Sequence, residues 1–197
     1  MPMSSSAKDA ARPNRGRAAG PANRAALLAA AREVFGEQGL SAPLSAVARR
    51  AGVGQGSLYR HFPSRTALAA AVFDENLDEV EQFVAASGTG LTALFDVVCA
   101  QAVVSTAMID LVEADRHDPD VERLGARFAA IVGRLVRTER ETGALASHVD
   151  VDDVLLAVGM IATVLARSDE DERAALATRG RAIFARAFRP AASSDAR

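Results

Sequence analysis

The stretch that most constrains this chain is LSAVARRAGVGQGSLYRHF, residues 44–62. Its first half repeats apolar side chains at steps of three and four, which place them on one face of a helix: Leu44, Val47, Ala48 and Ala51. Gly52 follows, and glycine readily adopts the left-handed conformation that ends a helix. Gly54 can cap a second short helix, on which Leu58 and Phe62 share a face. The spacing therefore predicts two short helices that meet at a tight corner.

Such a corner is the sequence form of a helix-turn-helix, whose second helix enters the major groove of DNA. The apolar pair on the second helix would pack against the first helix. The opposite face then carries polar and basic side chains: Gln55, Ser57, Arg60 and His61. The same corner also occurs in helical proteins that never bind DNA. A helical adaptor whose basic N-terminal part binds an acidic protein is therefore the alternative.

The charge distribution favours DNA binding. Residues 1–65 hold ten Lys and Arg side chains against three carboxylates, whereas the remaining residues hold 13 basic and 22 acidic side chains. The formal net charge of −2 thus conceals a strongly basic N-terminal third. Such asymmetry is typical of a nucleic-acid-binding module joined to a domain with another task.

In two segments, NRAALLAAAREVFGEQGL and AGVGQGSLYRHFPSRTAL, the chain resembles the TetR family of transcriptional regulators. The resemblance covers residues 23–68 and differs from the family pattern at two positions. Gly54 opens the recognition helix where Ser or Thr is usual, and Arg65 replaces the usual lysine. The resemblance implies an N-terminal DNA-binding domain and a C-terminal domain that binds a small molecule and dimerises through its last two long helices.

We expect the DNA-binding residues to lie on the second helix of the corner and just after it: Gln55, Gly56, Ser57, Tyr59, Arg60, His61 and Arg65. Gln55 is the first candidate for base reading, because glutamine can bond adenine in a bidentate manner. The resemblance implies that Tyr59, His61 and Arg65 hold the phosphate backbone.

The fold class predicted for the whole chain is all-α. Nearly half of the residues are hydrophobic, but only 5% are aromatic, which favours packed helices over sheet. We expect a disordered basic arm over residues 1–21, the helix-turn-helix domain over 22–65, a helical ligand-binding and dimerisation domain over 66–190, and a disordered tail over 191–197. Within the arm, Arg12, Arg15 and Arg17 either touch DNA or belong to a solvated tail.

Further helices are predicted over residues 23–38, 65–86, 91–113, 121–142 and 154–167, with a last helix that ends before Pro190. Asn23 is the expected start of the first. Arg123, Arg127, Arg134, Arg137 and Arg140 are expected on the exposed face of the helix over 121–142. The segment HVDVDD, residues 148–153, is expected to cap the helix that follows it.

The small-molecule effector is expected among the helices over 65–86, 91–113 and 121–142. Apolar side chains could form its walls, and one carboxylate could add a polar contact: Phe73, Phe95, Cys99, Met108, Asp96 and Asp110. The effector should therefore be apolar, and it should also be cationic if one of the aspartates faces it. The helix over 154–166 is apolar on too many faces for one small bundle to cover, which predicts a homodimer.

Nothing in the sequence points to catalysis. The three histidines are scattered, and neither a zinc-ligand spacing nor a glycine-rich nucleotide loop is present. We therefore expect no catalytic residue, no metal and no cofactor. One cysteine and no apolar leader segment predict a cytoplasmic protein that does not enter a membrane. Together these features predict a ligand-responsive repressor that binds a palindromic operator.

Overall fold

The computed structural model describes residues 15–88, 90–101, 110–111 and 114–190. Within these residues the fold is all-α, with eight helices and no strand. The helices are α1 (Arg15–Gln38), α2 (Leu44–Arg50), α3 (Gln55–His61), α4 (Arg65–Ser87), α5 (Leu91–Ala100), α7 (Pro119–Glu141), α8 (Val151–Ala166) and α9 (Glu170–Ala187). The predicted fold class is confirmed.

Helix α1 begins eight residues before the predicted start at Asn23. Arg15 and Arg17 therefore belong to a helix and not to a disordered arm, while Arg12 lies outside the described residues. Residues 15–19 are Arg, Ala and one Gly, and Arg and Ala have high helix propensity. Pro21 removes one backbone hydrogen bond from α1 but does not end it.

The helix-turn-helix forms as its glycines predict. Gly52 has a φ of +66°, and the Val53 amide after it donates to the Ala48 carbonyl at 3.0 Å. Gly54 is the N-cap of α3. Leu58 and Phe62 are buried, at 1% and 3% exposure, and pack in the same core as α1 and α2. This packing turns the polar side of α3 outward.

Two further helix starts follow from local capping. The Ser64 hydroxyl accepts a hydrogen bond from the Ala67 amide at 2.9 Å and begins α4. Asp150 and Asp153 form a reciprocal capping box at the start of α8, which confirms the expected role of the acidic segment before it. Helix α5 ends at Ala100, and most of the remaining part of the predicted 91–113 helix lies outside the described residues.

The start of α5 depends on a residue of α7. The Leu91 amide donates to the Glu139 carboxylate at 2.6 Å. Gly90 has a φ of +55°, and a Cβ atom at this position would overlap that carboxylate. Glycine therefore allows the acidic side chain to reach an amide that has no acceptor within its own helix.

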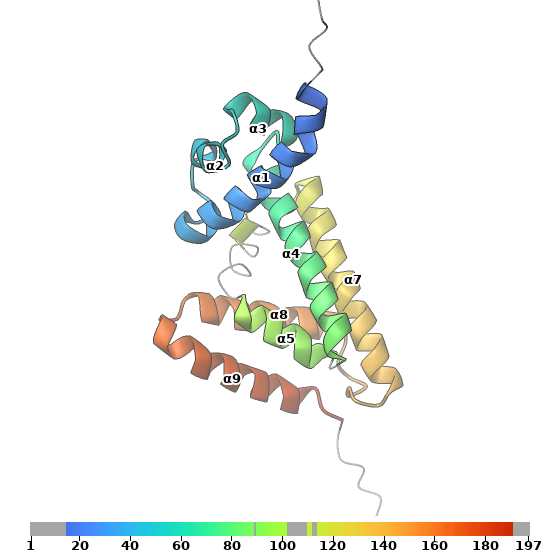
Figure 1. Cartoon of the computed structure of the whole chain (residues 1–197). Coiled ribbons are helices and arrows are strands. Elements are labelled where there is room, and N and C mark those ends of the chain that lie inside the picture. Colours follow the sequence, from blue (N-terminus) through green and yellow to red (C-terminus); the bar gives the residue numbers. More distant parts are fainter. Residues whose placement is uncertain (1–14, 89, 102–109, 112–113, 191–197) are drawn as a thin grey trace, which may run out of the picture.

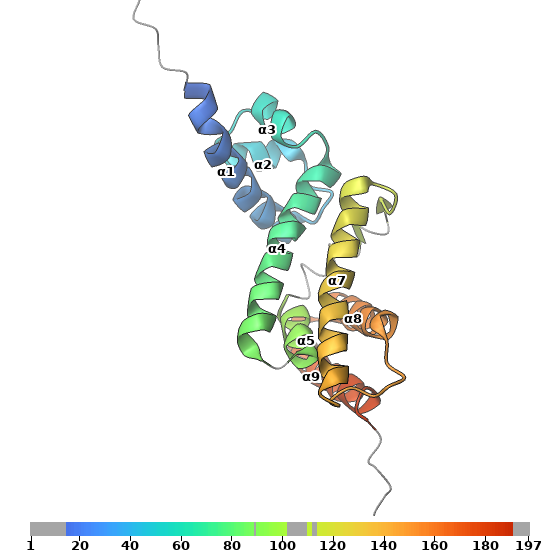
Figure 2. The same cartoon turned by 90° about the vertical axis from the view of Figure 1, so that its right-hand side faces the viewer.

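Helices α1–α3 form one end of the molecule, and α5, α8 and α9 form the other (Figure 1). Helices α4 and α7 run side by side between these ends, as both views show (Figure 2). The buried side chains form two clusters. The first core joins α1–α3 to the beginnings of α4 and α7, and the second core joins the ends of α4 and α7 to α5, α8 and α9.

Candidate nucleic-acid interface

Helix α3 presents most of the predicted DNA-binding side chains to solvent. Gln55, Gly56, Tyr59 and Arg60 are exposed, and Ser57 and His61 are half-buried. Tyr59 is 53% exposed, although it is a large aromatic residue. An exposed tyrosine can contact a phosphate or a sugar of DNA. The exposed side of α3 therefore carries the donors and acceptors that a DNA-reading helix needs.

Arg65, which the resemblance assigns to the phosphate backbone, has a different setting. It is the first residue of α4, it is half-buried, and its Nη1 donates to the carbonyl of Leu40 at 2.6 Å and to the carbonyl of Ala42. These bonds join the loop between α1 and α2 to the start of α4. Arg65 thus holds the helix-turn-helix against the rest of the molecule.

The basic charge of this region is partly neutralised within the protein. Arg50 pairs with Glu33 at 2.7 Å and with Glu37 at 3.0 Å. A hydrogen bond from Arg50 lowers the pKa of Glu37. Arg32 pairs with Glu75 of α4 at 2.9 Å. These pairs brace α1 against α2 and α4.

Three arginines of residues 20–64 have no carboxylate partner within the part of the chain that the structure describes: Arg24, Arg49 and Arg60. Arg24 lies over the Phe62 ring, with 5.3 Å between its guanidinium carbon and the ring centroid. This contact holds a cation at the end of α3. The position of Arg24 next to α3 is not predictable from the sequence, because its neighbour Phe62 is 38 positions away along the chain.

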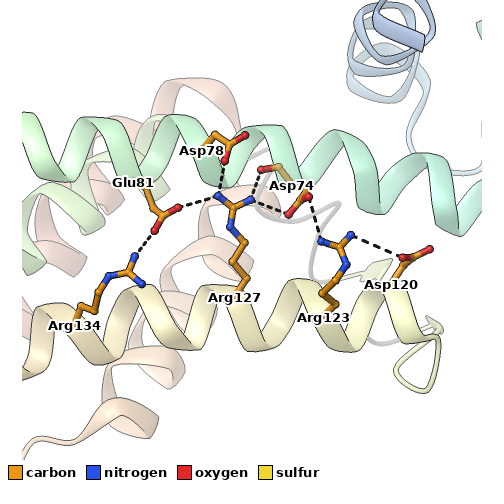
Figure 3. A network of polar contacts seen from close by, with 7 residues as sticks. All are labelled: Asp74, Asp78, Glu81, Asp120, Arg123, Arg127 and Arg134. Carbon is orange, nitrogen blue, oxygen red and sulfur yellow. Dashed lines mark hydrogen bonds and ion pairs between the residues drawn. The ribbon is translucent and has the colours of Figure 1, made fainter. Parts of the chain in front are cut away.

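Six charged residues join α4 to α7, and we call them the α4–α7 clasp: Asp74, Asp78, Glu81, Arg123, Arg127 and Arg134 (Figure 3). Arg127 is the centre. Its Nη1 donates to the Asp74 carboxylate at 2.8 Å and to the Asp74 carbonyl at 2.9 Å, and its Nη2 donates to Glu81 at 2.8 Å and to Asp78. Arg134 bonds the other oxygen of Glu81.

Of the five arginines expected on the exposed face of α7, Arg123, Arg134, Arg137 and Arg140 are exposed, whereas Arg127 is half-buried. The Arg127 side chain is 26% exposed, because it lies between its own helix and α4. Burial raises the pKa of Asp74, but hydrogen bonds from Arg127 and Arg123 outweigh that effect and the net pKa is lowered. The hydrogen bond from Arg127 likewise lowers the pKa of Glu81. Both carboxyl groups are therefore charged at neutral pH.

The residues predicted to bind an effector are not gathered in one place. Phe73 is buried in the first core, whereas Phe95 is buried in the second and stacks on Phe184 with 5.8 Å between ring centroids. Asp96 forms an ion pair with Arg181 of α9. Asp110 is exposed, and Met108 lies outside the described residues.

Cys99 is half-buried on α5 and packs against the second core. Burial raises the pKa of its thiol, so the thiol stays protonated at neutral pH. Of the predicted effector residues, Phe95 lines a cavity of about 260 Å³ between α5, α7 and α9.

Helices α8 and α9 lie at the end of the molecule opposite α3 (Figure 1). Both helices expose large apolar side chains. Leu156, Met160 and Val164 of α8 are 62%, 45% and 51% exposed, and Ile183 of α9 is 47% exposed. A groove of about 240 Å³ lies between the two helices and is lined almost entirely by apolar side chains. We call this the α8–α9 face. Three of its residues are spaced four apart, so they form one stripe on α8.

Among the residues described, no group of His, Cys, Asp and Glu side chains could hold a metal ion. No helix among them is long and apolar enough to cross a bilayer.

Residues 27–72 match the sequence model of bacterial regulatory proteins of the tetR family. No significant match was found among curated protein sequences. A TetR transcriptional regulator from Streptomyces coelicolor is similar in structure, with 26% identity, a TM-score of 0.58, and coverage of 86% of this chain and 99% of the other. A TetR transcription regulatory protein from Mycobacterium vanbaalenii has 26% identity, a TM-score of 0.62, and coverage of 88% and 98%. The ketosteroid transcriptional regulator KstR2 of Mycobacterium tuberculosis has the same fold at 20% identity, with a TM-score of 0.58 and coverage of 84% and 94%.

Proposed function

We propose that this chain, whose residues 27–72 match the tetR family model and whose fold is that of TetR regulators, acts as a homodimeric repressor that binds a palindromic operator and releases it when a small apolar effector binds. The observation that carries the proposal is the outward side of α3, where Gln55, Tyr59 and Arg60 are exposed while Leu58 holds the helix to the core. Gln55 reads a base edge, and Tyr59 and Arg60 contact the adjoining backbone or bases.

The α8–α9 face supports the homodimer. Exposed apolar stripes of this kind mark interaction sites, and the commonest symmetric oligomer is a dimer with the same patch on both subunits. Two copies that meet on this face would form a four-helix interface far from α3. A two-fold symmetric protein requires an operator with two inverted half-sites.

The position of α4 supports the effector proposal. This helix begins beside α3 and ends in the second core, so a ligand that binds between α4, α5 and α7 acts on the helix that carries the DNA-binding domain. A ligand that prefers another orientation of α4 must weaken operator binding, and operator must weaken ligand binding to the same extent. The proposed partner is double-stranded DNA. The proposed function requires no catalysis, and DNA binding would take place in the cytoplasm.

The experiment that tests DNA recognition is in vitro selection of 40-bp duplexes with a randomised centre. We expect enriched sequences with two inverted half-sites and one dimer bound to each duplex. Binding should weaken steeply as salt is raised, because phosphate contacts release counterions. If no sequence is enriched, the proposed function is wrong and the helical-adaptor alternative is favoured.

Repression is tested with a reporter whose promoter overlaps the selected operator. Transcript levels should fall when the protein is produced, whereas a rise would identify an activator. A library of apolar compounds is then screened for those that raise the thermal unfolding temperature, and the compounds found should restore transcription. Compounds that stabilise the protein without affecting the reporter would contradict the effector proposal.

A further inference from the structure

The α4–α7 clasp lies where the two cores meet. On α4, Leu77 belongs to the first core and Val80 to the second; on α7, Ile131 belongs to the first and Val132 to the second. The clasp residues of α4, Asp74 to Glu81, extend across this boundary. Each helix therefore passes from the DNA-binding half to the other half beside the clasp.

The apolar contacts between α4 and α7 do not determine their angle by themselves. Packing of leucine, valine and isoleucine ridges into grooves selects a class of crossing angle, but because these contacts are non-directional a scatter of about 15–20° remains within the class. Arginine differs, because its planar guanidinium donates in fixed directions and its bidentate bonds add geometric specificity. Four acceptors on three successive turns of α4 converge on Arg127. A rotation of α4 would break several of these bonds at once.

We infer that Arg127 is a positioning residue for operator recognition: by fixing the angle between α4 and α7, it sets the separation of the two recognition helices of a dimer and hence the half-site spacing that is read. The inference rests on the proposed function, since a spacing exists only for a dimer on two half-sites. Asp74 and Glu81 are its main partners, because each is only about one-third exposed. Arg123 has a peripheral part, with its side chain 53% exposed and a longer bond to Asp74 of 3.2 Å.

Loss of the clasp should act on the population of orientations and not on base recognition. If only about one-tenth of the molecules hold the α4–α7 angle that allows operator binding, the affinity for the operator falls about tenfold. The contacts of Gln55 with a base are unchanged in the molecules that do bind. Half-sites at other separations should become relatively better targets, because the freed helices reach them.

The first test measures orientation without DNA. Spin labels are attached at Ser45→Cys on α2 and Thr138→Cys on α7, both exposed positions, in a Cys99→Ala background. Labelled protein is diluted with unlabelled protein so that distances within one subunit dominate. We expect one narrow distance distribution for the parent and a broader one for Arg127→Met. The control is Arg137→Met on the same helix, where the arginine is exposed and has no ion pair among the described residues.

The second test repeats the duplex selection with half-sites separated by a spacer of variable length. We expect Arg127→Met to select the same half-site bases as the parent but a broader range of spacers, with about tenfold lower affinity for the parent's preferred spacer. Arg123→Met should show a smaller change, and Arg137→Met none. Circular dichroism and light scattering confirm that each variant is folded and dimeric before selection.

The outcomes separate the inference from the proposed function. If the parent selects no paired half-sites, the proposed function fails, whatever the variants do. If the parent selects one spacing and a folded Arg127→Met selects the same spacing with an unchanged distance distribution, the positioning role is wrong and the proposed function stands. A change in half-site bases would also overturn the inference, because it would assign Arg127 an effect on the reading helix itself.

Discussion

Gln55 is the first residue of α3, and its side chain is exposed. Gln55→Ala should weaken operator binding by about 1–3 kcal/mol, because a bidentate contact with one base is lost. The loss should be confined to one base position of each half-site. Quantitative binding to a series of operators with single substitutions measures this. An unchanged base preference at every position would show that Gln55 does not contact a base.

Arg65 is expected to act mainly on stability. Its guanidinium bonds two backbone carbonyls of the loop before α2, and charged hydrogen bonds of this kind contribute more than neutral ones. Arg65→Ala should lower the free energy of unfolding by about 2 kcal/mol, measured by urea denaturation. Arg49→Ala, which removes an exposed arginine with no carboxylate partner among the described residues, is the matched control. If Arg65→Ala leaves stability unchanged and instead lowers the salt slope of DNA binding by about one, the phosphate role implied by the family resemblance is correct.

At the scale of elements, the clasp should make the α4–α7 contact sensitive to acid. The pKa values of Asp74 and Glu81 are lowered in the folded protein from their ordinary 3.8 and 4.5. Carboxylates with lowered pKa stabilise the fold above their ordinary pKa, and this contribution is lost as the pH falls through the folded-state pKa. At neutral pH, Asp74→Asn should therefore cost on the order of 1 kcal/mol.

The measurement is urea denaturation of the parent and Asp74→Asn between pH 7 and pH 2.5. The difference in unfolding free energy should shrink as the pH falls below the ordinary pKa of the aspartate, because the parent then loses the same charge. Glu122→Gln, on an exposed α7 carboxylate outside the clasp, is the control. A difference between parent and Asp74→Asn that stays constant over the whole range would contradict the electrostatic role of the clasp.

The helices whose ends are marked by a glycine or a capping residue could be predicted from the sequence. Gly52, Gly54 and Ser64 mark helix ends within one turn of themselves, so α2, α3 and the start of α4 lie where the spacing puts them. The clasp was not predictable, because Asp74 and Arg127 are 53 positions apart and only the packing of α4 on α7 brings them together. The same limit applies to Phe73 and Phe95, whose apolar character predicts burial but not the core that buries them.

At the scale of the whole molecule, the α8–α9 face should control assembly. Met160→Glu should place an unpaired charge in the dimer interface and weaken dimerisation more than a hundredfold, since such a charge costs about 3 kcal/mol or more. DNA binding should fall with dimerisation. Light scattering and duplex binding measure the two effects. Phe83→Glu, at an equally exposed position on α4, is the control and should remain dimeric.

Met160 suits this test of assembly because its side chain is exposed in the single subunit. Val158 lies on α8 as well, but it is 6% exposed and packs in the second core of its own subunit. A charge at Val158 would therefore test folding and not assembly. A folded and fully dimeric Met160→Glu protein would assign the subunit interface to another surface.

The first core has a practical consequence for anyone who wishes to transplant the DNA-binding domain. Its walls are not confined to residues 22–65, since Leu68, Phe73, Leu77, Leu124 and Ile131 belong to the same cluster as α1–α3. In a chimera joined after Arg65, the apolar side chains of α1–α3 that pack in the first core would be exposed to water. A portable cassette must keep α4 at least through Leu77, and its new host must supply an apolar helix in the place of α7. Domain-swapping experiments between such regulators should therefore join the parts inside α4, after the first core is complete.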